Sequence, residues 1–219
     1  MRKVVAAALL ALVLAASLTV WASSITHRYS WEYGNRRWSL THTFPLAAYT
    51  RARELPHTVN YADYANYVHD PVDDEAISSL IEELEALAFQ AGLNVWEKLN
   101  LIMAFVQSLE YEAEAREYPK YPIETLVEGR GDCEDFSILA AALLKQMGFG
   151  VVLLAFTEEM HMAIGIRVLP PGEEDSHCYL WNGDAYYYLE TTASGWAIGT
   201  LPSNYTSSPK IIAVAPVGP

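Results

Sequence analysis

The spacing of hydrophobic positions changes near residue 150 of the chain. Before that point, residues 73–91 and Val95 to Leu109 repeat apolar side chains at helical spacing, and Asp132 to Met147 is almost wholly apolar after its first turn. After it, the apolar runs are short and alternating, as in strands, over residues 151–156, 162–168, 178–181 and 185–191. We therefore predict an α+β fold in which helices pack on an antiparallel sheet.

Turn residues predict a hairpin nearer the N-terminus. Aromatic residues alternate on both sides of Gly34-Asn35, so Tyr29 to Thr43 should form two antiparallel strands. The next stretch, Pro45 to Pro71, is rich in tyrosine and interrupted by prolines. We expect a wrapping segment with one short helix. Ordinary packing explains its tyrosines, and a substrate-facing role is the alternative.

The first residues of the chain carry an addressing signal. Arg2 and Lys3 precede an unbroken apolar run from Val4 to Ala16, and Ala22 supplies a small residue at a cleavage position. Residues 1–22 are predicted to be a signal peptide, with an uncleaved membrane tether through residues 4–22 as the alternative. We expect an exported protein, extracellular or at the cell surface. Residues 23–70 would form the N-terminal hairpin and wrapping segment, and residues 71–219 the main domain.

Composition and charge narrow the partners. The chain has 219 residues, 52% of them hydrophobic and 19% charged, so it can bury a sizeable core and is not expected to be disordered. Its formal net charge is −13. Because phosphate binding needs a basic face, this charge argues against nucleic acid as a partner.

Reactive chemistry concentrates around one of the two cysteines. Cys133 lies in the first turn of a helix, where free N–H groups and the helix dipole favour a thiolate. A thiol hydrolase of the papain type also needs a histidine on a strand and a polar residue that orients the imidazole. His161 opens one predicted strand and Glu190 ends another, in the required order. We predict that Cys133, His161 and Glu190 form a catalytic triad.

The segments around these three residues resemble the motifs of the transglutaminase-like superfamily. Tyr121 to Asp135 resembles its nucleophile motif, and the runs that begin at His161 and Tyr188 resemble its second and third motifs. The likeness covers roughly Asp73 to Ile198 and is strongest with exported archaeal and bacterial members. It implies a papain-like core and acyl transfer through a thioester on Cys133. Most of the superfamily has aspartate at the third position, where this chain has Glu190.

The substrate implied by the resemblance is a protein, a peptide or another carboxamide. A cysteine peptidase or amidase would release the acyl group to water, whereas a crosslinking transglutaminase would transfer it to an amine. We favour hydrolysis, because the short chain shows no added domains that would present protein amines.

Two further assignments complete the predicted site. The backbone N–H of Cys133 is an expected oxyanion donor, and Gln107 is a candidate second donor. Three carboxylates, those of Asp132, Glu134 and Asp135, surround the thiol, although negative neighbours raise a thiol pKa. We interpret them as compensated by the helix dipole and solvent. The alternative is calcium binding, which the resemblance to bacterial transglutaminase-like cysteine proteinases implies for these residues. No other cofactor is expected.

Two other classes of protein compete with an enzyme. A non-catalytic binding module would keep the fold and the cleft without turnover, and both Glu190 and the unassigned oxyanion side chain favour it. A structural exported protein would join Cys133 to Cys178 in a disulfide. The sequence contains neither a phosphate-binding loop nor a zinc signature.

Overall fold

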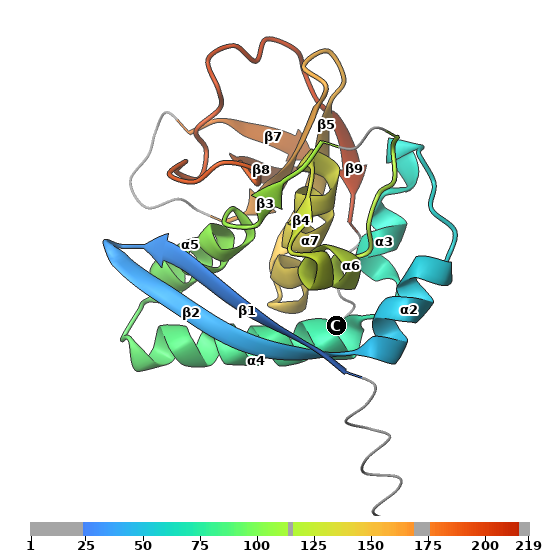
Figure 1. Cartoon of the computed structure of the whole chain (residues 1–219). Coiled ribbons are helices and arrows are strands. Elements are labelled where there is room, and N and C mark those ends of the chain that lie inside the picture. Colours follow the sequence, from blue (N-terminus) through green and yellow to red (C-terminus); the bar gives the residue numbers. More distant parts are fainter. Residues whose placement is uncertain (1–23, 114–115, 169–175, 215–219) are drawn as a thin grey trace, which may run out of the picture.

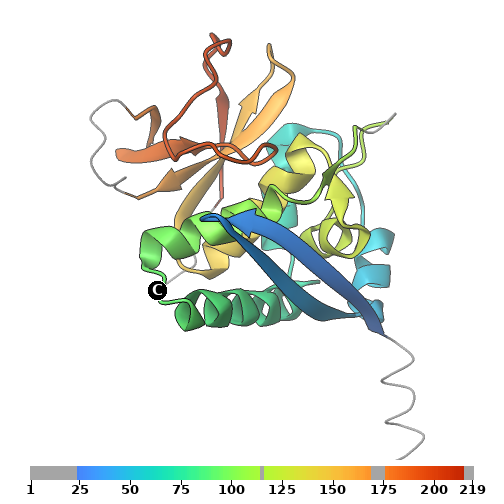
Figure 2. The same ribbon diagram turned by 60° about the vertical axis from the view of Figure 1, so that its left-hand side comes forward.

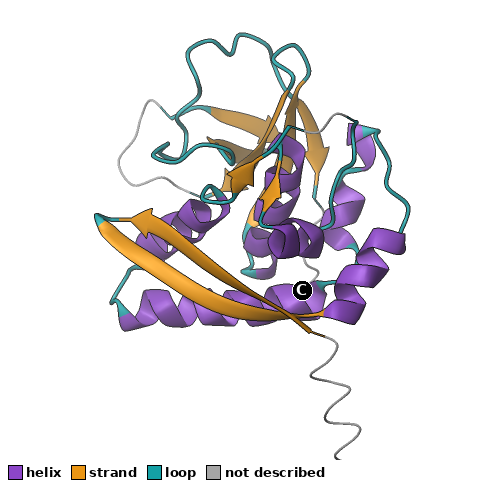
Figure 3. Ribbon diagram, viewed as in Figure 1, coloured by secondary structure: helices purple, strands orange, loops and turns teal. Residues whose placement is uncertain are grey.

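The computed structural model describes residues 24–113, 116–168 and 176–214. Helices form one layer, a five-stranded sheet forms the other, and a long hairpin crosses the helical layer (Figures 1 and 3). The elements are β1 (Ser24–Tyr33), β2 (Arg36–Pro45), α2 (Leu46–Glu54), η1 (Tyr61–Asp63), α3 (Ala65–His69), α4 (Asp74–Gln90), α5 (Val95–Val106), β3 (Glu110–Tyr111), α6 (Pro122–Glu128), β4 (Arg130–Gly131), α7 (Cys133–Gln146), β5 (Gly150–Phe156), β6 (His161–Arg167), β7 (Cys178–Trp181), β8 (Asp184–Leu189) and β9 (Lys210–Ala213).

The N-terminal hairpin forms where the sequence predicts it and is longer at both ends. Gly34 and Asn35 both have positive φ, 61° and 58°, as a tight two-residue hairpin turn requires. The inward side chains Tyr29 and Trp31 meet Phe105 of α5 edge to face, at ring-centroid distances of 5.0 and 5.3 Å. The hairpin therefore shares the hydrophobic core of the helices.

The long predicted helices are present. Helix α4 begins with Asp74 and Glu75 in its first turn, where acids favour the helix dipole. Helix α5 begins with a capping box between Asn94 and Glu97, and it ends at Val106, three residues before the predicted Leu109. Helix α7 is buried along almost its whole length, as its apolar sequence predicts.

Several short elements differ from the sequence prediction. The wrapping segment holds two helices and a 3₁₀ turn (α2, η1 and α3), not one short helix. Helix α6 was not predicted, although Pro122 in its first turn and Gly129 at its C-cap, with φ of 68°, are typical helix boundaries. Strand β9 was also missed, because four residues far from their partner strand give too short a pattern.

The five-stranded sheet is antiparallel, in the order β7-β8-β6-β5-β9. Alternate residues of β5 point to opposite faces, so Val151, Leu153 and Ala155 join the core with the helices. Val152 and Leu154 join a second cluster on the outer face. Figure 2 shows the sheet and the helical layer from the side. The predicted α+β class is confirmed.

None of the helices in the described ranges is long and apolar enough to cross a membrane. The predicted signal peptide, or tether, over residues 1–22 lies outside those ranges.

Candidate active site

A tight turn places Cys133 at the start of α7. Strands β3 and β4 pair in parallel, Tyr111 with Gly131, immediately before the helix. A Cβ at Gly131 would lie 2.7 Å from the Cβ of Asp135, closer than side-chain atoms normally approach. Glycine is therefore required here, and it lets the chain turn sharply into the helix that carries the thiol.

Asp135 holds this turn in place. Its carboxylate accepts hydrogen bonds of 2.7 Å from both the backbone N–H and the Nζ of Lys120, and only 1% of the residue is exposed. Burial raises the pKa of Asp135 to about 7, although the charge and hydrogen bonds of Lys120 lower it. Asp135 thus ties the start of α7 to the segment before α6.

The sheet brings His161 and Glu190 together. Ile164 of β6 pairs with Leu189 of β8. Glu190 follows Leu189, and by this register it lies diagonally across from His161 on the same face of the sheet. Nε2 of His161 is 3.3 Å from Oε2 of Glu190. The distance is that of an ion pair, but the alignment falls outside that of a hydrogen bond. With Nε2 facing Glu190, Nδ1 is the ring nitrogen left for a second partner.

Glu190 is fixed by its own surroundings. The hydroxyl of Tyr188 donates to Oε2 at 2.6 Å, and the N–H groups of Thr191 and Thr192 donate to Oε1 at 3.0 and 2.9 Å. Burial by itself raises the pKa of Glu190. Stabilisation by His161, Tyr188 and the Thr192 N–H outweighs burial and lowers the pKa to about 2. The carboxylate is therefore ionised at neutral pH.

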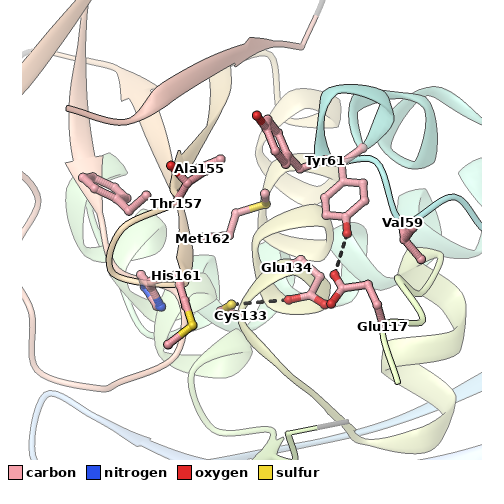
Figure 4. A pocket seen from close by; sticks show the side chains of 12 residues that line it. Val59, Tyr61, Glu117, Cys133, Glu134, Ala155, Thr157, His161 and Met162 are labelled. Carbon is pink, nitrogen blue, oxygen red and sulfur yellow. Dashed lines mark hydrogen bonds between the residues drawn. The ribbon is translucent and has the colours of Figure 1, made fainter. Parts of the chain in front are cut away.

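Cys133 and His161 line one cleft of about 540 Å³ (Figure 4). One wall comes from the wrapping segment, with Val59, Tyr61 and Tyr64. The opposite wall comes from the β5–β6 hairpin, residues 155–162. The candidate nucleophile and base therefore face a space large enough for part of a peptide.

The resting thiol differs from the sequence prediction. Burial raises the pKa of Cys133, and the charge of Glu134, whose Oε2 lies 3.3 Å from Sγ, raises it further. The backbone N–H of Met162 acts in the opposite direction. The expected lowering by the helix start was thus wrong for the free protein, because burial and neighbouring carboxylates outweigh it.

The candidate metal ligands Asp132, Glu134 and Asp135 do not form a cage. Asp135 is engaged by Lys120, and Oε2 of Glu134 faces Sγ of Cys133 at 3.3 Å. Across the described ranges, no group of three His, Cys, Asp or Glu side chains is arranged to hold a metal ion. These three residues as placed do not fit a calcium ion, and calcium dependence stays a prediction.

Gln107 contacts the chain at Glu190, and its hydrogen bond is not directed at an oxyanion position. Its Nε2 donates to the backbone carbonyl of Glu190 at 2.8 Å. This bond fixes the chain at the end of β8, so the structure gives Gln107 a positioning contact. The predicted oxyanion donation by Gln107 stays a prediction.

Sequence reasoning missed several supporting residues. Ser137, one turn after Cys133, forms a buried 3.0 Å hydrogen bond with the hydroxyl of Thr191. The ring of Tyr205 packs edge to face on His161, with centroids 5.6 Å apart. The period-2 spacing of Tyr188 and Glu190 was a usable signal, because it places both on one face of a strand. Nothing in the sequence pattern pointed to Tyr205.

The predicted disulfide alternative is not formed. Cys133 and Cys178 are both free thiols. Cys178 lies on the edge strand β7, and β8 separates that strand from β6, which carries His161. The alternative of a structural exported protein held by a Cys133–Cys178 disulfide is therefore not supported.

The order of these parts defines a class of fold. A buried helix carries a cysteine at its start, and the antiparallel strands that follow carry a histidine and its carboxylate partner. This is the arrangement of a papain-like, transglutaminase-like core.

The sequence matches no protein-family model and no curated protein. Among solved structures, LapG of Legionella pneumophila is 20% identical over 69% of this chain and 73% of its own, with a TM-score of 0.37. A calcium-bound form of the same protein matches 75% of this chain and 79% of its own, with the same identity and TM-score. A TGase is 15% identical over 87% of this chain and 50% of its own, with a TM-score of 0.39. Because these TM-scores are low, the function proposed below is argued from the residues of the site and not from these proteins.

Proposed function

We propose that this protein is a thiol-dependent acyl-transfer enzyme that hydrolyses peptide or carboxamide bonds. The observation that carries the proposal is the 3.3 Å approach of Nε2 of His161 to the buried, ionised Glu190, with His161 and Cys133 lining the same cleft. A histidine held by a carboxylate beside a thiol is the arrangement of a nucleophile with its activating base.

The reaction follows from these positions. The sulfur of Cys133 attacks the substrate carbonyl carbon while its proton passes to Nδ1 of His161. The tetrahedral intermediate then loses its amine, which takes that proton, and a thioester to Cys133 remains. Water attacks the thioester, gives a proton to His161 and releases the acid, and the proton returns to the sulfur. Glu190 stabilises the imidazolium that forms in each half.

The raised pKa of Cys133 affects the first step. Burial and the charge of Glu134 raise the pKa of the thiol, which favours transfer of its proton to His161 during attack over a preformed thiolate. The same observation favours a second candidate function, a binding module with an unreactive thiol.

Hydrolysis of a denatured protein substrate tests the proposal. Wild type should produce new amino termini, and Cys133→Ala should produce none with its thermal midpoint unchanged. A fluorescent primary amine added to the same assay separates the two acceptors, since a crosslinker would incorporate it into the substrate. Substrate binding without product or amine incorporation by wild type would support the binding module instead.

A further inference from the structure

One wall of the cleft comes from outside the region that carries the sequence motifs. Val59 and Tyr61 belong to the wrapping segment, whereas the resemblance begins at Asp73. The side chains of Val59 and Tyr61 line the cleft opposite Thr157 and His161 (Figure 4). This wall is therefore specific to the chain's own N-terminal part and does not belong to the catalytic core.

The wall is built in advance of any substrate. Thr58 donates its N–H to the hydroxyl of Tyr67 at 2.6 Å, and Nδ1 of His57 is 2.7 Å from the carbonyl oxygen of Pro119. On the other side of Val59, the hydroxyl of Tyr64 donates to Glu117 at 2.7 Å. Val59 thus stands between anchored residues, which lowers the ordering cost of binding a ligand.

The opposite wall is also anchored. Met160 lies in the turn between β5 and β6, next to His161. The neighbouring Glu159 accepts hydrogen bonds of 3.0 Å from the N–H groups of Thr206 and Ser207, which tie this turn to the segment before β9. Met160 is nevertheless 88% exposed and Val59 is 64% exposed, although both line the cleft. An apolar group between them would remove both side chains from water.

The charge of the cleft is one-sided. Among the described residues that line it are two carboxyl groups, those of Glu117 and Glu134, and neither lysine nor arginine. Burial and Asp132 raise the pKa of Glu134 to about 9, so Glu117 carries the negative charge at neutral pH. Lys210, the cation that touches the wall, is already engaged by the hydroxyl and ring of Tyr61. A carboxylate entering the cleft would therefore lose hydration and face Glu117 without a lining cation to pair with.

We propose that this cleft selects a substrate whose side chain next to the reacting carbonyl is bulky and apolar, and that it rejects a carboxylate there. Val59 and Met160 are the specificity-determining residues. This inference rests on the proposed acyl-transfer site and adds the chemical class of its substrate.

Chloromethyl ketones with a leucine-like or an aspartate-like side chain test recognition without turnover, because they alkylate a thiol beside the site they occupy. Wild type should react with the leucine probe roughly tenfold faster or more, since one apolar group discriminates by that order. Val59→Asp and Met160→Asp should each reduce this preference severalfold. Leu180→Asp, which changes an exposed apolar residue on the edge strand β7, should leave the preference unchanged.

Three outcomes are distinguishable. Equal rates with both probes, or an unchanged preference in both cleft variants, would overturn the selectivity. Intact wild-type preference without any peptide hydrolysis would overturn the proposed turnover and leave the recognition site standing. Plain iodoacetamide and the thermal midpoint serve as controls in every variant, because a change in either would show that the thiol or the fold had been altered.

Discussion

Both oxygens of the Glu190 carboxylate have partners. One oxygen faces His161 and the hydroxyl of Tyr188, and the other accepts from Thr191 and Thr192. The longer glutamate side chain therefore reaches the imidazole while three backbone and hydroxyl donors hold it ionised.

We predict that Glu190→Gln reduces hydrolysis by about two to four orders of magnitude, because a neutral amide cannot stabilise the imidazolium. The measurement is kcat on a peptide substrate, with the thermal midpoint as a check on folding. Glu190→Asp should retain part of the activity. A Gln variant with wild-type kcat would show that His161 does not depend on this charge.

The thiol gives a second prediction at this scale. Burial and Asp132 raise the pKa of Glu134 to about 9, so its charge acts on the thiol from about that pH upward. Because that charge raises the pKa of Cys133 from 3.3 Å away, Glu134→Gln should increase the fraction of thiolate in this range. Alkylation of Cys133 by iodoacetamide at about pH 9.5 should become severalfold faster. The exposed Cys178 provides an internal control, and its rate should not change. Slower labelling of Cys133 in the variant would mean that Glu134 activates the thiol.

At the scale of elements, the short connections decide where the chemistry lies. The turn at Gly131 and the salt bridge from Lys120 to Asp135 set the start of α7 relative to α6. Strands β3 and β4 and helix α6, which precede the thiol, are all short. The position of the thiol therefore depends on close packing at Gly131.

Gly131→Ala should therefore destabilise the fold by about 1–3 kcal/mol, because the added methyl group overlaps Asp135 and the neighbours must shift. Urea unfolding measures the change. Gly150→Ala is a matched control, since its Cβ would mainly meet the side chain of Arg167, which is exposed and can move. Equal losses in the two variants would remove the special role of Gly131.

Sequence patterns predicted the elements that are long and regular. The 3.6 period identifies α4 and α5, and the Asn182-Gly183 turn identifies the β7–β8 hairpin, because local residues determine each of them. Strand β9 depends on a distant partner strand and was missed, and the short helix α6 was missed although Pro122 and Gly129 mark its ends. Within the site, the sequence predicts a helix start for Cys133 and strand positions for His161 and Glu190, and that they form a triad stays a prediction. A substrate-facing role for the tyrosines of the wrapping segment was only the alternative, because no local pattern records which distant segment lies across a cleft; Tyr61 and Tyr64 do line it.

At the scale of the whole molecule, buried carboxyl groups shape the response to pH. Asp73 joins α4 to α6 through a 2.9 Å hydrogen bond from the N–H of Ile123. Burial raises its pKa to about 7, and its acidic neighbours Asp74 and Asp70 add to the rise. Asp135 has a pKa raised to about 7 for the same main reason.

A raised pKa means that the folded protein holds a proton that the unfolded chain has lost. Between the unfolded pKa of about 3.9 and the folded value, stability must therefore fall as pH rises, by up to roughly 1.4 kcal/mol per pH unit for each such group. We predict that Asp73→Asn makes the dependence of the unfolding free energy on pH shallower in this window. Asp135 keeps part of the slope. An unchanged slope in urea titrations across the window would show that Asp73 is ionised throughout.

The buried hydrogen bond between Ser137 and Thr191 joins two segments 54 residues apart. The bond can form only when the helix that begins with Cys133 is docked on the sheet, so it ties the cysteine side of the proposed site to the Glu190 side. The geometry of that site is thus a property of the complete tertiary structure, and no fragment that lacks either the helix or the last strands would reproduce it.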